Sequence, residues 1–127
     1  MADYLNRQRQ TYDAEGVLIT AGAITASVAV KVGVNQEVNV GENVLLEAVL
    51  QVRGTVSGTS PTLDVSVQES DTEGGTYTAI PGASFVQKTA VGEERIAFRT
   101  TKAWVCTVIT AGGTTPSFGD TEAFIAG

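Results

Sequence analysis

The sequence predicts an all-β fold: an antiparallel β-sandwich, jelly-roll-like in its strand pattern, in a single domain with an extended N-terminal arm. Three observations lead to this prediction. Val, Ala, Thr and Gly dominate the composition, and Val and Thr suit pleated, half-buried strands. Apolar and polar residues alternate over several stretches of the chain. Turn-forming residues separate these stretches at intervals of about ten residues, which is the spacing expected of a sandwich.

The clearest strand is predicted over residues 44–53. One face of this segment holds its apolar side chains, Val44, Leu46, Ala48, Leu50 and Val52. A repeat of two over that length is typical of a strand with one buried face. A helix over residues 42–52 is the competing interpretation, and the β-branched residues and glycine-rich flanks favour the strand.

The remaining strands bring the predicted total to seven to nine. Two or three short strands are expected within residues 17–40, where Val28, Val30 and Val32 share one face. A turn at residues 55–62 precedes a strand at 63–70, which buries its alternate apolar residues. Further strands are predicted at 75–80, 94–100, 102–110 and 118–126. In the segment 102–110, Trp104, Cys106 and Val108 share one face, and Trp104 is expected in the core.

Two distant segments of the chain repeat the same short sequence pattern. "GTSPTLDV" (residues 58–65) and "GTTPSFGD" (residues 113–120) share the form Gly-Thr-Ser/Thr-Pro. Proline is tolerated where a strand begins, because its missing N–H is not needed there. We interpret the two segments as equivalent hairpin corners, with a duplicated binding site as the alternative.

The acidic stretch "ESDTEGG" raises the question of a calcium site. Glu69, Asp71 and Glu73 fall on alternate positions before Gly74, but the closing bidentate glutamate of an EF-hand loop is missing. A hairpin tip explains the same residues, because Gly74 and Gly75 supply the positive φ that tight loops need. We therefore predict a solvated hairpin tip and no metal site.

Composition also excludes several classes of function. The net charge of −6 disfavours a nucleic-acid partner and an anionic membrane surface. The chain has no His, which removes the commonest general base and metal ligand. Cys106 is the only cysteine, and its apolar strand predicts a small buried hydrophobe. The polar N-terminus does not have the form of a signal peptide, so we expect a soluble protein.

Enzyme chemistry is not indicated by any motif. A small carboxylate hydrolase remains a third possibility, but no acid sits in an apolar run that would raise its pKa. Glu47 and Glu122, which have apolar neighbours, fit the outward face of a strand. Tyr77 is the better exposed aromatic residue, and one tyrosine does not make a sugar-binding platform. We predict no catalytic residue, no cofactor and no metal.

Residues 1–16 are predicted to form the arm, and residues 17–127 the sandwich domain. The arm is rich in Gln, Asn and Arg, and no apolar stripe persists long enough for a stable helix. Five of its residues could contact a partner: Tyr4, Leu5 and Tyr12 as apolar anchors, Arg7 and Arg9 as polar contacts. A frayed terminus is the alternative.

The segments "LDVSVQESDTEGGTYTAIPGASF" and "ERIAFRTTKAWVCTVITAGGTTPSFGDTEAFI" resemble tailed-phage capsid decoration, or cement, proteins. The likeness covers about half the chain. The residues that carry it are Gln68, Ser70, Asp71, Gly74, Tyr77, Ile80, Pro81, Gly82, Thr115, Pro116, Ser117 and Phe118.

That resemblance implies a β-sandwich, often a homotrimer, clamped onto the outside of an icosahedral capsid. It implies the major capsid protein and sister subunits as partners, and the exterior of the virion as the location of a protein made in the host cytoplasm. Many modest contacts repeated across a shell would stabilise it by avidity. The alternative is a phage tail, fibre or adhesin-like module that binds host carbohydrate or a receptor.

Overall fold

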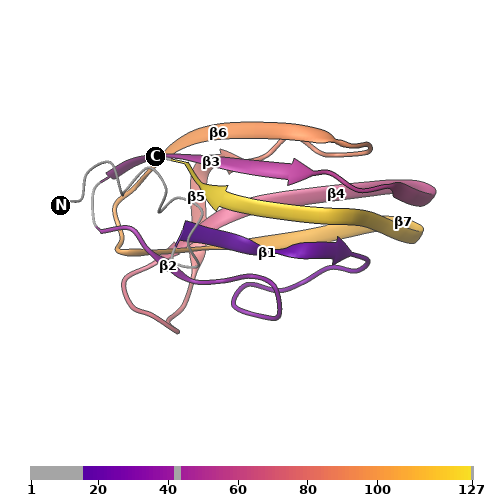
Figure 1. Cartoon of the computed structure of the whole chain (residues 1–127). Helices are drawn as coiled ribbons and strands as arrows, with labels where there is room; N and C mark the ends of the chain where they lie inside the picture. Colours follow the sequence, from indigo (N-terminus) through magenta and orange to yellow (C-terminus); the bar gives the residue numbers. More distant parts are fainter. Residues whose placement is uncertain (1–15, 42–43, 127) are drawn as a thin grey trace.

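The computed structural model describes residues 16–41 and 44–126 and is built of antiparallel strands (Figure 1). In chain order they are β1 (Val17–Ile24), β2 (Val38–Asn39), β3 (Val44–Val52), β4 (Val56–Ser70), β5 (Thr78–Ser84), β6 (Gly92–Thr100) and β7 (Trp104–Ile125). Every pairing between these strands is antiparallel. The predicted all-β sandwich is therefore confirmed. In this part of the chain, no helix is long and apolar enough to cross a membrane.

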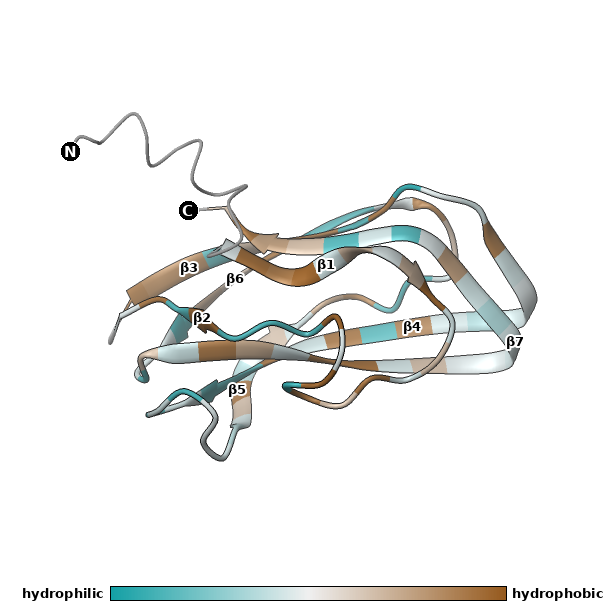
Figure 2. Ribbon diagram, turned by 60° about the horizontal axis from the view of Figure 1, so that its bottom comes forward, coloured by the Kyte–Doolittle hydropathy of each residue, from teal (hydrophilic) through white to brown (hydrophobic). Residues whose placement is uncertain are grey.

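Two layers make up the sandwich, and the long strand β7 belongs to both (Figures 1 and 2). Residues 121–125 of β7 pair with β3, which pairs in turn with β6, and β1 lies on the other side of β7. Residues 104–118 of β7 pair with β4, which pairs with β5, and β2 lies beside them. The chain thus crosses between layers inside β7.

A continuous ribbon runs through both layers, because β3 and β4 follow β7 along almost all of its length. Ala48 pairs with Ile125 at one end of the ribbon, and Ser70 pairs with Trp104 at the other. Where the ribbon changes layer, Gly54 N donates to the Gly119 carbonyl at 2.8 Å. The expectation of only short strands is therefore wrong, because β4 has 15 residues and β7 has 22.

The core lies between the two layers and confirms the main strand predictions. In β3 the face that includes Leu46, Ala48, Leu50 and Val52 is buried, so the helical alternative is wrong. In β6, Phe98 is buried while Arg95 and Arg99 are exposed. Other core residues come from the other strands: Leu18, Ile19, Val38, Leu63, Val65, Val67, Ile80, Val105, Ile109 and Phe118.

The structure contradicts the positions expected for two apolar side chains, Val32 and Trp104. Val32 is 53% exposed, because Lys31 and Gly33 have φ angles of 70° and 57° and interrupt the strand there. Trp104 is only half-buried and does not lie in the core. The neighbouring Val105 takes the core position, because it pairs across the second layer with the inward face of β4.

Candidate interaction sites

The arm residues singled out from the sequence, Tyr4, Leu5, Arg7, Arg9 and Tyr12, lie outside the described residues, so their role stays a prediction. The structure does show where the predicted arm would connect to the sandwich. Val17 pairs with Phe124, and the Ala126 N–H donates to the Glu47 carbonyl at 2.8 Å. The arm therefore joins at the end of the sandwich where β7 finishes.

The acidic loop, residues 69–75, comprises the end of β4 and the turn that leads towards β5. One side of the loop is bound to the end of β6 and the turn that follows it. The Glu69 carboxylate accepts hydrogen bonds from Thr100 Oγ1 at 2.6 Å and from the Thr101 N–H at 3.3 Å. Asp71 forms an ion pair with Lys102 at 3.2 Å. Two of the loop's three acids are therefore bound by other parts of the chain.

A second set of contacts fastens the other side of the loop. Lys31 Nζ donates to the carbonyls of Gly75 at 2.6 Å and Gly74 at 3.2 Å, and it lies 5.7 Å from the centre of the Tyr77 ring. The Glu37 carboxylate accepts from the Gly74 N–H at 2.6 Å and from the Tyr77 hydroxyl at 2.8 Å. We call these five residues the clasp.

The clasp also fixes the state of Tyr77. Burial, together with the Glu37 carboxylate, raises the pKa of the Tyr77 phenol far above its usual range. The hydroxyl therefore stays protonated and continues to donate to Glu37. Because its ring faces Lys31 and its hydroxyl is bound, Tyr77 contributes to internal structure on this side of the molecule.

The hairpin interpretation of the acidic loop is confirmed, since β4 and β5 pair on either side of it, with Glu69 opposite Thr78. Gly74 has a φ of 74°, as a tight loop needs. Glu69 and Asp71 are bound to different partners, and the described residues hold no group of three potential metal ligands. The geometry thus gives the calcium hypothesis no support.

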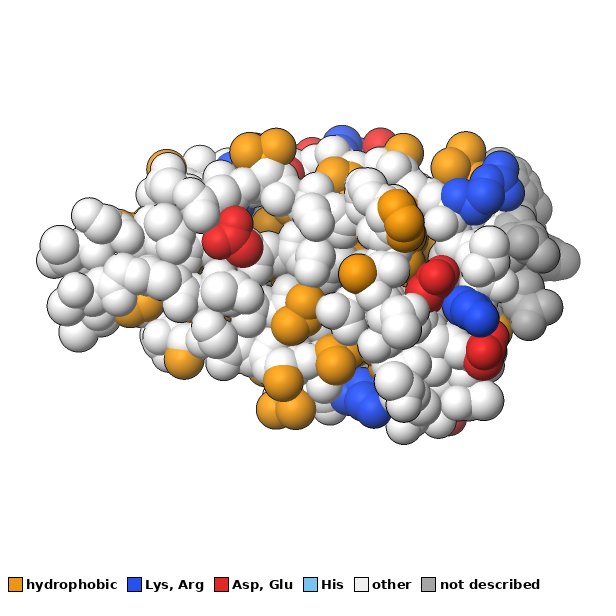
Figure 3. Space-filling model, turned by 180° about the vertical axis from the view of Figure 1, so that it is seen from behind, with side chains coloured by type: hydrophobic (Ala, Val, Ile, Leu, Met, Phe, Trp, Pro, Cys, Tyr) orange, Lys and Arg blue, Asp and Glu red, His pale blue; other side chains and the backbone are white. Residues whose placement is uncertain are grey.

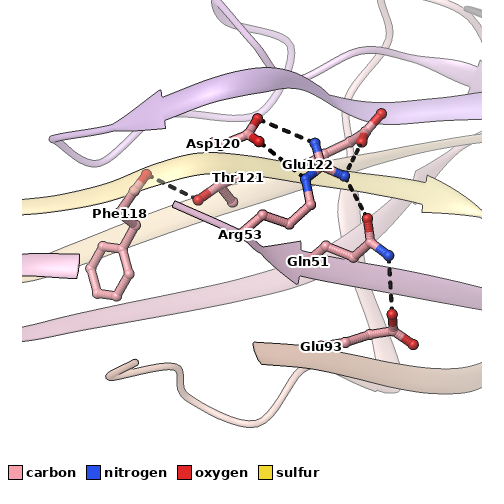
Figure 4. Close-up of polar contacts among 7 residues, drawn as sticks. All are labelled: Gln51, Arg53, Glu93, Phe118, Asp120, Thr121 and Glu122. Atoms are coloured by element: carbon pink, nitrogen blue, oxygen red, sulfur yellow. Dashed lines mark hydrogen bonds and ion pairs between the residues drawn. The ribbon is translucent and has the colours of Figure 1, made fainter. Parts of the chain in front are cut away.

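A network of charged side chains covers part of the outer face of the first layer (Figure 4). Arg53 donates through Nε and Nη2 to both oxygens of Asp120 at 3.2 Å, and through Nη1 to Glu122 at 2.8 Å and Gln51 at 2.6 Å. Gln51 donates in turn to Glu93 at 3.0 Å. These side chains satisfy one another across three strands.

The same network continues on β6 and lowers the pKa of two of its acids. Arg95 donates to Glu93 at 2.7 Å and to Glu47 at 3.4 Å. The hydrogen bond from Arg53 lowers the pKa of Asp120, and those from Gln51 and Arg95 lower the pKa of Glu93. A general acid needs a raised pKa, so these two acids are unsuited to that role in hydrolysis.

The end of the sandwich where the ribbon changes layer has a different chemistry. We call residues 54–62 and 111–119 the ribbon bend; neither segment contains Asp, Glu, Lys or Arg. Figure 3 shows this end, on the left, without charged side chains at its tip. Its exposed hydroxyl-bearing residues are Thr55, Ser57, Thr59, Ser60, Thr114 and Thr115.

The two echoing segments run inside β4 and β7 and pair with each other in the ribbon bend, so the prediction that they form equivalent hairpin corners is wrong. Gly58 in β4 and Gly113 in β7 have φ angles of 111° and 100°. Two residues later, Ser60 and Thr115 have φ angles of 50° and 47°. The repeat in sequence is therefore a repeat in backbone conformation.

The strand register in the bend has the same local two-fold symmetry. Thr59 lies opposite Thr114 at the centre, and two equivalent pairs flank it, Ser57–Ser117 and Thr62–Gly112. A Cβ atom added to Gly58 would lie 2.6 Å from the Thr115 carbonyl oxygen, and one added to Gly113 would lie 2.5 Å from that of Ser60. Each glycine lets the opposite strand approach closely.

Sequence patterns did not single out Lys31 and Glu37. Their partners in the acidic loop lie between 37 and 44 residues away along the chain. The one local signal is that both charges interrupt a Val-rich segment that was expected to form a strand. A charge inside such a segment indicates a polar partner, and the sequence does not say which.

Comparisons with known proteins identify no family. No protein-family model matches the chain, and no curated protein sequence matches it. Among solved structures, it is similar to the CBM22-1–GH10 modules of the endo-1,4-β-D-xylanase 10B of Clostridium thermocellum, complexed with xylohexaose. The TM-score is 0.46 at 14% identity, over 90% of this chain and 27% of that one. The chain spans about a quarter of that protein, and a likeness this small does not place it in that family.

Proposed function

We propose that the chain is a viral structural protein that decorates the outside of a phage capsid. It would bridge capsid subunits and so stabilise the shell, with the major capsid protein and sister copies, as a homotrimer, for partners. The resemblance in residues 68–82 and 115–118 supports this proposal. In the structure these residues form the acidic loop, the start of β5 and part of the ribbon bend.

The observation that carries the proposal is the difference between the two ends of the sandwich. The arm joins at the end where β7 finishes. The opposite end is the uncharged ribbon bend (Figure 3). Charged residues are depleted in the cores of protein interfaces, because burying a charge without a partner is unfavourable. A sandwich with one end joined to the predicted arm and the other end free of charge suits a protein that spans neighbouring subunits.

Binding to capsids tests the proposal directly. Purified protein is sedimented with undecorated capsids assembled from the major capsid protein of the phage that carries its gene. Saturable co-sedimentation is expected, and binding to host glycans without any binding to capsids would support the tail or adhesin alternative instead. The absence of a major capsid gene nearby would also count against decoration.

The role of the arm needs matched variants. Deleting residues 2–16 is expected to abolish most capsid binding while the sandwich stays folded, as judged by circular dichroism. A triple alanine variant at Tyr4, Leu5 and Tyr12 should bind weakly, whereas one at Asn6, Gln8 and Gln10 should bind normally. Full occupancy by the truncated protein would remove the arm from the proposal.

A further inference from the structure

The clasp joins two regions that are far apart in the sequence. Lys31 and Glu37 belong to the segment that connects β1 to β2, and their partners belong to the connection between β4 and β5. Its four hydrogen bonds share atoms: Lys31 Nζ serves two carbonyls, and Glu37 Oε2 serves both Gly74 and Tyr77. Contacts that share a donor or an acceptor are lost together more readily than independent ones.

The segment that carries Lys31 is held to β1 near its end, where the Thr20 N–H donates to the Val34 carbonyl and the Gln36 N–H donates to the Leu18 carbonyl, and to β7 at its start. Val28 exchanges two backbone hydrogen bonds of 3.0 Å with Ile109. The buried Asn35 side chain donates to the carbonyls of Val28 and Ala29 and accepts from Thr107 Oγ1 at 2.6 Å. Between these anchors the chain turns through Lys31, whose left-handed φ of 70° is unfavourable for a residue with a side chain.

Cys106 lies beneath the clasp. It is fully buried although it belongs to the outward face of β7, and it is not part of the apolar cluster between the layers. Burial raises the pKa of the Cys106 thiol, and the backbone of Lys31 and the charge of Glu37 also act on it. Residues of the clasp therefore form the immediate surroundings of the thiol.

We propose that the clasp is a single conformational unit and that its opening is what exposes Cys106. When the Lys31 contacts with the loop break, the Glu37 contacts break with them. The residues of the clasp then move apart, and the thiol becomes accessible to solvent. The sandwich stays folded, because the core and the ribbon take no part in the clasp. Anything that binds one half of the clasp therefore changes the position of the other. This inference does not depend on capsid decoration.

The rate at which a thiol reagent labels native Cys106 tests the proposal. Lys31→Met keeps the side-chain length and the strained φ but removes the donors, and Glu37→Leu removes the shared acceptor. Each is expected to raise the labelling rate about tenfold or more, because each removes two hydrogen bonds that involve a charged group. The double variant should label within about twofold of the faster single variant, because loss of either half already releases the other.

Two control variants separate local opening from general loss of stability. Lys102→Met breaks the Asp71 ion pair on the other side of the same loop, and Arg53→Met disturbs the network on the far layer. Both should label at about the wild-type rate, within roughly twofold. Amide exchange at Gly74 gives a second measurement that does not use the thiol, and it should accelerate in Lys31→Met.

Three results would overturn the proposal. One is an unchanged labelling rate in both clasp variants. Another is a double variant in which the two single effects multiply, because the halves would then open independently. The third is a labelling rate that follows the unfolding midpoint across clasp and control variants alike, because exposure would then require global unfolding.

Discussion

The acidic loop lies at one end of the ribbon and the ribbon bend lies at its middle, where it changes layer, and the two regions are held in shape by different means. In the acidic loop, side chains make the contacts: Lys31 and Glu37 bind one side, and Lys102 pairs with Asp71 on the other. In the ribbon bend, neither segment carries a charge, and the shape depends on left-handed backbone at Gly58 and Gly113.

This difference indicates how each region responds to change. Exposed charged contacts contribute little each and are screened by salt, so a loop held by them can open without unfolding the sandwich. A close approach between two backbones has no such freedom, because an added atom must displace a strand. We therefore expect the loop to tolerate substitution and the bend to resist it.

The largest effect is expected from Gly58→Ala in the ribbon bend. The new Cβ would lie 2.6 Å from the Thr115 carbonyl oxygen, and the φ of 111° is unfavourable for alanine. Overpacking against backbone and left-handed strain together should lower the free energy of unfolding by about 3 kcal/mol or more. Urea denaturation measures this loss.

Gly74→Ala in the acidic loop is the matched control. Gly74 has a similarly left-handed φ of 74°, but a Cβ atom there would meet nothing within 4 Å. Only the backbone strain remains, so the loss should be about 1 kcal/mol. Equal losses at the two glycines would contradict the view that close approach of the strands determines the shape of the bend.

The next effect is expected at two buried threonines, one near each region. Thr107 Oγ1 donates to Asn35 Oδ1 at 2.6 Å, beneath the segment that carries Lys31, and Thr121 Oγ1 donates to the Phe118 carbonyl at 3.0 Å. Thr107→Val leaves a buried amide oxygen unpaired and should cost about 1–3 kcal/mol, with Thr121→Val near 1 kcal/mol. The exposed Thr110→Val should change the unfolding free energy by less than about 0.5 kcal/mol.

The alternation of apolar residues predicts much of this fold. The buried face of β3 and the hairpin around the acidic loop follow from local patterns, since a repeat of two and a glycine pair are visible over a few residues. The ribbon bend does not follow from them. Gly58 and Pro61 are turn formers in isolation, and only their pairing with residues 111–119 makes them part of a strand.

The clasp could not be predicted for a related reason. Its hydrogen bonds join residues 37 to 44 positions apart, and sequence alternation carries no information about such pairs. The face of β7 on which Trp104 lies could not be predicted either, because it depends on the register in which β7 pairs with β4. A shift of one residue in that register exchanges the two faces of a strand. The arm residues stay a prediction on which the described residues do not bear.

A smaller effect of opposite sign is expected from Thr115→Gly. Thr115 is β-branched and has a φ of 47°, which is strained for such a residue. Relief of that strain should raise the unfolding free energy by about 1 kcal/mol, less the entropy that glycine loses on folding. Thr114→Gly, next to it in ordinary backbone, should lower stability by about 0.5–1 kcal/mol. A loss at both positions would show that the left-handed backbone of the bend is not strained.

The smallest effect is expected where the charged network borders the bend, in Arg53→Met. The hydrogen bond from Arg53 lowers the pKa of Asp120 in the folded protein. A carboxyl group of this kind adds stability above its unfolded pKa and loses it as the pH falls through its folded pKa. The wild type should therefore exceed the variant in stability near pH 7, and the difference should fade as the pH falls through the lowered pKa of Asp120.

The difference in stability between the wild type and Arg53→Met measures how much the charged network stabilises the bend. The side chains of Arg53 and Asp120 are 41% and 54% exposed, so water and salt weaken their attraction. We expect a small difference in unfolding midpoint that shrinks further in high salt, and no dependence on pH in the control Arg99→Met on β6. A difference that persisted at low pH would mean that Arg53 acts mainly by packing its aliphatic stem against the ribbon. In that case the bend, like the acidic loop, would depend on a side chain for its shape.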